Sequence, residues 1–145
     1  MKNKTNYDDL NSLNLRVLIT LSRTTQTVHK RSGQIFREGG HTTAQFAVLE
    51  VLYHKGPLSV GQIIESILST AGNMTVVINN LEKEGLIKRY PNPEDKRSYI
   101  IEITESGKTS IQSIFPKHLD DLEKSFGNLT GGEKNVLISL LKKIK

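Results

Sequence analysis

The 145-residue sequence contains no cysteine and no tryptophan, and it has only four phenylalanines and four tyrosines. Without cysteine the chain cannot form a disulfide, a thiolate metal site, a cysteine nucleophile or a thiol redox switch. With so few aromatic residues, its hydrophobic core has to be built mainly from aliphatic side chains. These absences exclude thiol chemistry as the basis of any function of the chain.

Long hydrophobic runs are also missing. No apolar stretch approaches the roughly 18 residues of a membrane-spanning helix, and the polar segment Met1–Asn14 lacks the apolar region of a signal peptide. We therefore expect a soluble, cytoplasmic protein that has no membrane partner. The length favours one domain, or one domain with extensions.

The net charge of +5 is only a weak indication of nucleic-acid binding. Lys and Arg outnumber Asp and Glu by seven to three in residues 1–40 and by seven to five in residues 104–145. In residues 41–103 they number six against seven, and most of those six lie in residues 88–97. The local placement of charge therefore carries more information than its total.

A first helix is predicted over residues 11–37, which contain no proline, and Gly39-Gly40 ends it. At about 27 residues it would be about 40 Å long, which is longer than a small domain needs. It is either a core helix with a frayed start or a helix whose ends pack on a second copy of the chain. Its apolar stripe is formed by Leu10, Leu13, Val17, Leu21, Val28, Ile35 and Phe36.

A second helix is predicted to begin at a capping box, in which Thr42 caps the helix and Gln45 reaches back to it. Gly56-Pro57 ends this helix near Lys55. The short segment Leu58–Val60 is a candidate third strand of a small sheet.

Two short amphipathic helices follow, joined by a turn at Leu68–Thr70. Each has apolar residues at positions i, i+3, i+4 and i+7, and Glu84-Gly85 ends the second helix. The stripes are Val60, Ile63, Ile64 and Ile67, then Met74, Val77, Ile78 and Leu81. Two short helices in this arrangement are typical of a helix-turn-helix.

A β-hairpin is predicted directly after the helix-turn-helix. Leu86–Tyr90 is its first strand, Pro91-Asn92-Pro93 interrupts the chain, and Tyr99–Ile103 alternates with a period of two despite Ile100. This hairpin is the wing of a winged helix-turn-helix, an architecture that reads DNA.

The C-terminal part predicts two more helices. The first begins at Thr104-Glu105, with a cap and an acidic first turn. Pro116 should kink this helix rather than end it, because the apolar pattern resumes afterwards. A second capping box, Thr130–Glu133, starts the last amphipathic helix.

The predicted fold is mainly α with a small β wing. We assign residues 41–104 to the winged helix-turn-helix, and residues 1–40 and 105–145 to flanking dimerisation helices. The reason is that the terminal helices carry more apolar surface than a winged core can cover, and a homodimer would bury it.

The second short helix carries the candidate base-reading residues. Away from its apolar stripe it presents small polar and methyl-bearing side chains, which suit base edges in a major groove. With the residues just before the helix, they are Ser69, Thr70, Asn73, Thr75, Val76, Asn79 and Asn80. An amide at Asn79 or Asn80 suits adenine, and the methyl groups of Thr75 and Val76 suit thymine. The alternative is an ordinary polar helix face.

The wing carries the second candidate set, Lys88, Arg89, Asp95, Lys96 and Arg97. Beside a recognition helix, an arginine suits the negative potential of a narrow minor groove. Asp95 would fix the direction of the arginine two residues later through a charge-assisted contact. The alternative is a basic loop that is simply solvated.

The run Asn73–Arg89 resembles the recognition helix and first wing strand of the MarR family of bacterial regulators. Pro93–Ser98 followed by Ile101–Thr104 is similar to that family's wing signature, an Asp-x-Arg pair before the second wing strand. The resemblance spans essentially the whole chain. It implies a homodimer on a pseudo-palindromic operator, usually a repressor released by a small, often phenolic, molecule. It also implies that Asp95 orients the wing and that Arg97 enters the minor groove.

Within the family, Phe115–His118 and Leu129-Thr130 look closest to a branch that responds to quinones and catechols. Family members often carry Arg where Val76 stands, and Asp and a basic residue where Asn79 and Asn80 stand. Residues 60–82 contain no Lys or Arg. Phosphate contacts would then come from the wing, from Lys55, from helix N-terminal amides or from the first helix.

A small-molecule effector is expected to wedge between the first two helices and the fifth, near Arg16, Ile19, Phe46 and Tyr53. The four histidines, His29, His41, His54 and His118, lack metal-ligand spacing, so we expect no metal and no cofactor. No phosphate loop, nucleophile elbow or paired-carboxylate site is visible, so we do not predict an enzyme. Two rivals to the DNA-binding interpretation stay open: an enzyme, which would need such a catalytic constellation, and a winged-helix module that binds another protein and not DNA.

Overall fold

The computed structural model describes residues 5–67 and 73–145 of the chain. In chain order, the elements are α1 (Asp9–Glu38), α2 (Thr43–Lys55), β1 (Leu58–Ser59), α3 (Val60–Ser66), α4 (Met74–Lys83), β2 (Ile87–Pro91), β3 (Tyr99–Ile103), α5 (Glu105–Phe126) and α6 (Gly131–Leu141). The mainly helical fold with a small sheet, predicted from the sequence, is confirmed.

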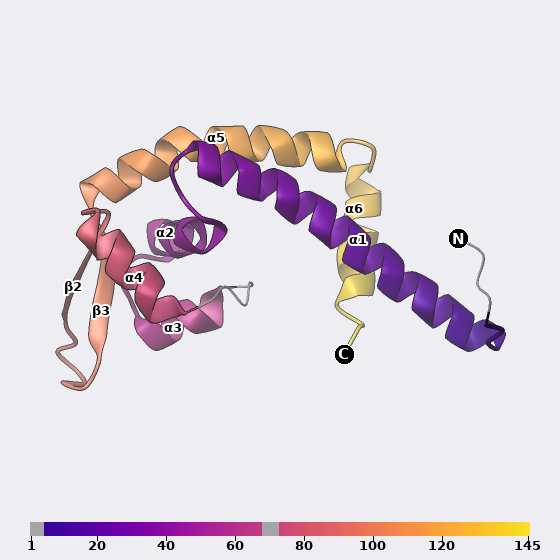
Figure 1. Ribbon diagram of the computed structural model, residues 1–145, viewed down its shortest axis with the longest axis horizontal. Helices are drawn as coiled ribbons and strands as arrows, with labels where there is room; N and C mark the ends of the chain where they lie inside the picture. The colour runs from indigo at the N-terminus through magenta and orange to yellow at the C-terminus, as the bar shows by residue number, and fades with distance from the viewer. Residues whose placement is uncertain (1–4, 68–72) are drawn as a thin grey trace.

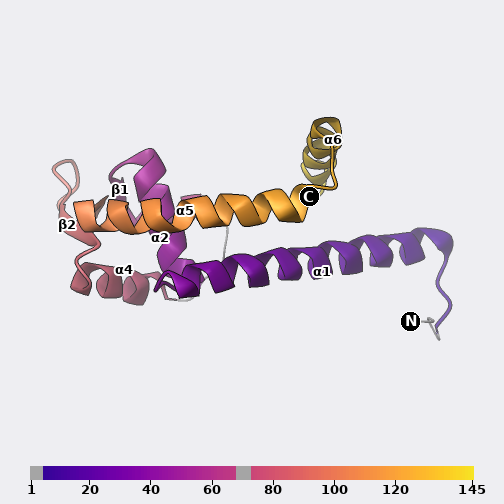
Figure 2. The ribbon, with the colours of Figure 1, turned by 90° about the horizontal axis from the view of Figure 1, so that it is seen from above.

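The winged part of the chain lies at one end of an elongated molecule (Figure 1). Helices α1 and α5 run side by side in opposite directions, and α1 extends well beyond the winged part (Figure 2). Helix α6 crosses near the far end of α5 in both views. The winged unit thus lies at one end of the antiparallel pair of helices α1 and α5.

The three strands form one antiparallel sheet in the order β1-β3-β2. Leu58 pairs with Ile101, and Ile87 pairs with Ile103 at the base of the hairpin. The predicted wing and its third strand are therefore confirmed. Gly107 lets the start of α5 pack on this base, because a Cβ there would collide with the carbonyl oxygen of Leu86.

Helix ends follow local sequence signals closely. The capping boxes at Thr42 and Thr130 form as predicted, and Ser59 forms a third that sequence reasoning missed. Gly85 ends α4 with a φ of 74°, a left-handed conformation that favours glycine. As expected, α5 continues through Pro116.

A single hydrophobic core joins the winged unit to α1 and α5. The winged unit supplies most of the buried side chains, while Phe36 comes from α1 and Ile111 and Ile114 come from α5. The other members are Phe46, Val48, Leu49, Leu52, Ile63, Ile78, Leu81, Ile87, Ile101 and Ile103. Helices α1 and α5 therefore pack directly on the winged unit.

Two segments expose apolar side chains instead of burying them. In α1 the only buried residues are Ser32, Gly33 and Phe36, near its C-terminal end. In α6 no residue is buried. The large exposed residues are Leu10, Leu13, Leu15, Val17, Leu18, Ile19 and Leu21 in the first segment, and Val136, Leu137, Ile138, Leu140, Leu141 and Ile144 in the second. Within the described residues, no helix is both long enough and apolar enough to cross a membrane.

Candidate nucleic-acid interface and adjoining cavity

Helix α4 turns one face into the core and the other outward. Ile78 and Leu81 are buried, whereas Thr75, Val76 and Asn80 are exposed. This division is what the apolar stripe predicts, because a helix repeats every 3.6 residues. The outward face therefore holds three of the seven residues that were expected to read bases.

The start of α4 is capped by Asn73, whose side-chain carbonyl accepts a hydrogen bond from the Thr75 backbone N–H at 3.1 Å. Asn73 thus has a structural role as well as a place near the expected DNA surface. The predicted contacts Ser69 and Thr70, and the turn at Leu68–Thr70, lie outside the described residues.

Asn79 and Arg89 face each other across the gap between α4 and β2. Arg89 Nη2 donates to Asn79 Oδ1, and Arg89 Nε lies 3.3 Å from Glu82 Oε2. The guanidinium carbon also lies 5.9 Å from the centre of the Tyr99 ring. Sequence reasoning placed Arg89 with the outward wing cations, but its side chain is turned toward α4.

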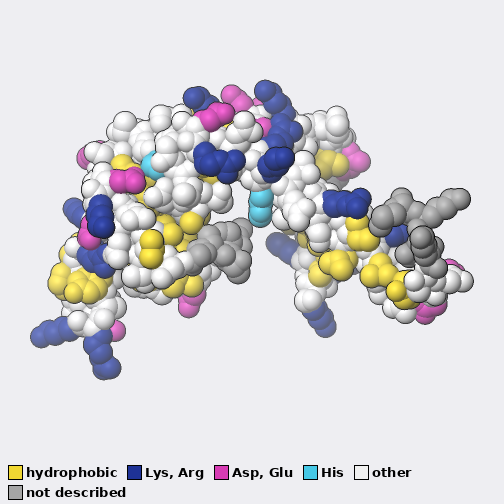
Figure 3. All heavy atoms as spheres, in the orientation of Figure 1, with side chains coloured by type: hydrophobic (Ala, Val, Ile, Leu, Met, Phe, Trp, Pro, Cys, Tyr) yellow, Lys and Arg dark blue, Asp and Glu magenta, His cyan; other side chains and the backbone are white. Residues whose placement is uncertain are grey.

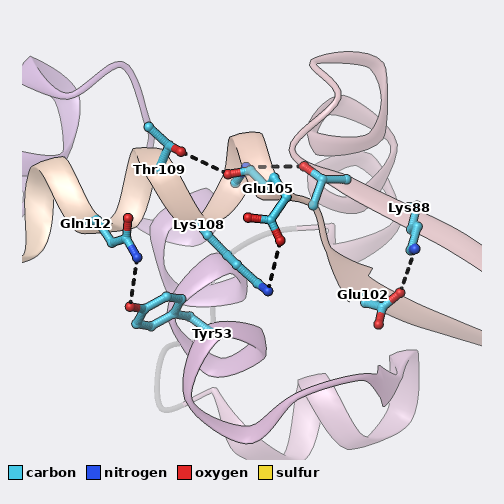
Figure 4. Close-up of polar contacts among 9 residues, drawn as sticks. Tyr53, Lys88, Glu102, Glu105, Lys108, Thr109 and Gln112 are labelled. Atoms are coloured by element: carbon cyan, nitrogen blue, oxygen red, sulfur yellow. Dashed lines mark hydrogen bonds and ion pairs between the residues drawn. The ribbon is translucent and has the colours of Figure 1, made fainter.

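Lys88 is paired along the wing with its cross-strand neighbour. Lys88 Nζ lies 2.9 Å from Glu102 Oε2 (Figure 4), in a register that places the two residues directly opposite. The hydrogen bond and the charge of Glu102 raise the pKa of Lys88. An exposed pair of this kind contributes little stability, and it lowers the charge that Lys88 offers to a phosphate.

The tip of the wing is closed by hydrogen bonds within residues 92–98. The Ser98 N–H donates to the Asp95 carbonyl at 3.0 Å, and Asn92 Nδ2 donates to Ser98 Oγ at 3.1 Å. Asp95 Oδ1 accepts from the Arg97 backbone N–H at 3.0 Å. The expected contact between Asp95 and the arginine side chain is replaced by this backbone contact. Asp95 therefore orients Arg97 through the turn, since a carboxylate can close a loop on a nearby N–H.

Lys96 and Arg97 are the exposed cations of the tip. Among the described residues neither makes a salt bridge, in contrast to Lys88 and Arg89. Figure 3 shows Lys and Arg side chains projecting from the end of the molecule that holds the wing. The structure thus divides the four predicted wing cations into two held by carboxylates and two that project from a closed turn.

A cavity of about 440 Å³ lies between α1, α2 and α5. The rings of Phe36 and Phe46 stack at its wall with centroids 3.9 Å apart, and His118 meets both rings edge-on. The lining also includes His29, Ser32, Thr43, Glu50, His54 and Lys55. This space can hold a small planar molecule between an aromatic wall and a few polar groups.

The four residues expected to line an effector pocket do not share this cavity. Phe46 lines it, but Arg16 lines a second cavity of about 580 Å³ between α1, α6 and the end of α5. Ile19 is exposed. Tyr53 is exposed, and its hydroxyl accepts a hydrogen bond from Gln112 Nε2 at 3.3 Å, which ties α2 to α5 (Figure 4). His118, which sequence reasoning did not place among the effector residues, lines the cavity, and effector binding there stays a prediction.

Two histidines, His41 and His118, have ring nitrogens that are buried. His41 Nε2 shares a hydrogen bond of 2.6 Å with Ser110 Oγ, and the Nδ1 atoms of His41 and His118 are buried without a partner among the described residues. Burial lowers the pKa of both imidazoles below 6.5, although Glu84 near His41, and Glu50 and Asp121 near His118, act in the opposite direction. No group of three or more His, Asp or Glu side chains in the described ranges is arranged to hold a metal ion.

The lowered pKa values predict an acid-sensitive fold. The unfolded chain binds more protons on these histidines than the folded chain does, so the free energy of unfolding should fall as the pH drops below about 6.5. Urea unfolding at pH 7.5 and pH 5.5 measures this difference. His41→Asn and His118→Asn should each reduce it, and an unchanged pH dependence in both variants would contradict the assignment.

Comparison with known proteins gives consistent matches. The sequence model of a family described as "MarR family" matches residues 42–99. The regulator YkoM of Bacillus subtilis, described as an uncharacterized HTH-type transcriptional regulator, is 37% identical over 84% of this chain and 79% of its own. The HTH-type transcriptional regulator MhqR of the same organism is 32% identical over 90% of each chain. A solved structure of a mutant MarR from E. coli, complexed with operator DNA, has a TM-score of 0.72 and 26% identity, and covers 95% of this chain and 99% of that one.

Proposed function

Because this chain belongs to the MarR family of transcriptional regulators, we propose that it binds a pseudo-palindromic operator as a homodimer and represses transcription until a small phenolic or quinone-like ligand releases it. The family and its matching relatives are transcription regulators rather than enzymes. A protein with this role works where the chromosome is, so we place it in the cytoplasm.

The observation that carries the DNA-binding proposal is the pairing of an outward helix with a closed basic tip. Thr75, Val76 and Asn80 are exposed on α4, and Lys96 and Arg97 are exposed on the wing. In this proposal α4 enters the major groove, while the tip contacts the flanking minor groove. The helix itself contributes little charge, so affinity for the phosphate backbone depends mainly on the wing.

The dimer proposal assigns segments 1–40 and 105–145 to the interface and residues 41–104 to DNA. Helix α6 is apolar on more than one side, which is typical of a helix that is buried in the functional assembly. Two of its exposed leucines, Leu137 and Leu141, line the same cavity as the exposed part of α1. Two recognition helices in such a dimer would need to lie about 34 Å apart to enter successive major grooves.

The effector proposal rests on the cavity between α1, α2 and α5. A planar aromatic ligand would pack on Phe36 and Phe46 and meet the polar atoms of His118 and Ser32. Val28 and His29 line both this cavity and the one beside α6. A ligand that shifts α1 therefore acts on the dimer face as well. A ligand that favours one spacing of the two recognition helices by a few kcal/mol changes operator occupancy markedly.

The test is selection of bound sequences from a random DNA pool, followed by a salt titration of the enriched sequence. We expect an inverted-repeat motif and a steep negative slope of log K against log salt, because bound Lys and Arg release counterions. The selection itself also tests the rival function. A winged module that binds a protein partner, which the near-neutral charge of residues 41–103 favours, would enrich no sequence. Repeating the selection with candidate phenols and quinones tests the effector.

A further inference from the structure

We propose that Asn79 reads a base whose major-groove edge presents hydrogen-bond acceptors and no amino donor, guanine or thymine, because Arg89 already occupies its carbonyl oxygen. This inference rests on the proposed DNA-binding function. It replaces the adenine contact that the sequence indicated for Asn79, and it makes Arg89 a positioning residue for base recognition.

The orientation of the Asn79 amide follows from the chemistry of its partner. An arginine guanidinium has five N–H donors and no acceptor, so the Asn79 atom that faces Arg89 Nη2 has to be the oxygen. Arg89 is held in turn by Glu82, which lies 3.3 Å from Nε on the same edge of the guanidinium. The ring of Tyr99 lies against the guanidinium as well, 5.9 Å from centroid to Cζ.

This arrangement decides what Asn79 offers to a groove. Recognition of adenine by asparagine uses the oxygen and the NH₂ of one amide together, on N6 and N7. At Asn79 an approaching adenine N6 amino group would meet an oxygen that is shared with a cation and would lie beside the N–H donors of Arg89. Among the described residues the Nδ2 amino group has no such competitor, and it can donate to the O6 and N7 of guanine or the O4 of thymine. Adenine offers N7 as well, but its N6 amino group would then face the occupied oxygen and the donors of Arg89.

The position of Asn79 on α4 is consistent with this role. It lies one turn after Thr75 and Val76, which are exposed, at the border between this outward face and the face that buries Ile78 and Leu81. Asn79 itself is only partly exposed because β2 packs beside α4 at this point. The Arg89–Glu82 pair is neutral as a unit, so the cluster orients an amide without adding charge for a phosphate contact.

The experiment compares the base preferences of the full-length wild-type chain and its variants in selections from a random DNA pool. Wild type should select guanine or thymine at one position of each half-site, and Asn79→Ala should lose that preference by about 3- to 10-fold. Asn79→Asp keeps an oxygen toward Arg89 but turns an acceptor outward. It should select cytosine or adenine at the same position, because those bases present amino donors.

Two further variants test whether Arg89 sets the base preference of Asn79 or only stabilises the fold. Glu82→Gln leaves the Asn79–Arg89 contact in place and should keep the wild-type profile. Arg89→Met frees the Asn79 oxygen and should add adenine to the accepted bases. Urea unfolding of each variant confirms that it is folded before its profile is compared.

Three results of the comparison between wild type and its Asn79 variants would overturn the inference. They are selection of adenine by the wild-type chain at the position that Asn79→Ala relaxes, an unchanged profile in Asn79→Asp, and a uniform loss of affinity across all sequences in Asn79→Ala. A wild-type chain that enriches no sequence would contradict the proposed function and this inference together. Enrichment with a profile indifferent to residue 79 would contradict the inference alone.

Discussion

Replacing Arg97 with alanine is expected to weaken operator binding by about 1–3 kcal/mol. The guanidinium projects from a turn that is closed by hydrogen bonds, and it makes no salt bridge among the described residues. It therefore reaches DNA without first breaking an internal contact. Fluorescence anisotropy at fixed salt measures the change, and Lys88→Ala is the matched control, because Glu102 already pairs with that lysine and its loss should weaken binding less.

Asp95, which closes the turn beneath Arg97, offers a second test of the same mechanism. Asp95→Ala removes the acceptor of the Arg97 N–H and should reproduce part of the loss, whereas Asp95→Asn keeps an oxygen there and should bind nearly as well as wild type. If Asp95 instead acted through a charge-assisted contact with the Arg97 guanidinium, its carboxylate would be required. Asp95→Asn would then weaken operator binding as much as Asp95→Ala does. Unchanged affinity in both Arg97→Ala and Asp95→Ala would remove the wing from the mechanism.

The second large effect concerns the dimer. Placing glutamate at Leu137 and Leu141 should give monomers and weaken operator binding by about 100-fold or more, because a single recognition helix loses the avidity of the pair. Both leucines are exposed in the isolated chain and line the cavity between α1 and α6. A leucine that becomes fully buried contributes about 1.5–3 kcal/mol, and each glutamate replaces this gain with the cost of burying an unpaired charge. Two such glutamates should therefore abolish the interface.

Sedimentation of the double variant measures the oligomeric state, and anisotropy measures the binding. Lys134→Glu, a charge reversal in the polar first turn of α6, is the control and should remain dimeric. Truncation before Asn128, which removes α6 altogether, should give monomers or aggregates. A stable dimer in both the double variant and the truncated chain would show that the interface lies elsewhere.

The helix boundaries and the wing were predictable because their signals are local. The capping boxes at Thr42 and Thr130 involve residues three positions apart, and the hairpin at residues 87–103 follows from alternation around a proline-rich break. Apolar stripes also divided α4 correctly into an inner and an outer face. In each case the physical cause lies within one or two turns of the chain, so a single sequence is sufficient.

The lining of the cavity did not follow from the sequence. Phe36, Phe46 and His118 come from three different helices, His118 lies far from the other two in the sequence, and no local pattern marks them as neighbours. Arg16 and Tyr53 lie on the correct helices but on other parts of their surfaces. The rotation of one helix against another decides which residues meet, and that rotation is a property of packing.

By itself, the sequence determined that this chain is a winged helix-turn-helix protein with apolar terminal helices, because periodicity, capping and turn residues act over short distances. The tertiary structure alone decided which of the candidate DNA-contacting residues are already paired with other residues of the chain. Arg89 and Asn79 read as two independent polar residues along the chain, but β2 returns beside α4 and makes them partners. Likewise, Asp95 holds the Arg97 backbone and not its side chain. Such choices between competing partners depend on three-dimensional proximity, which residue spacing does not specify.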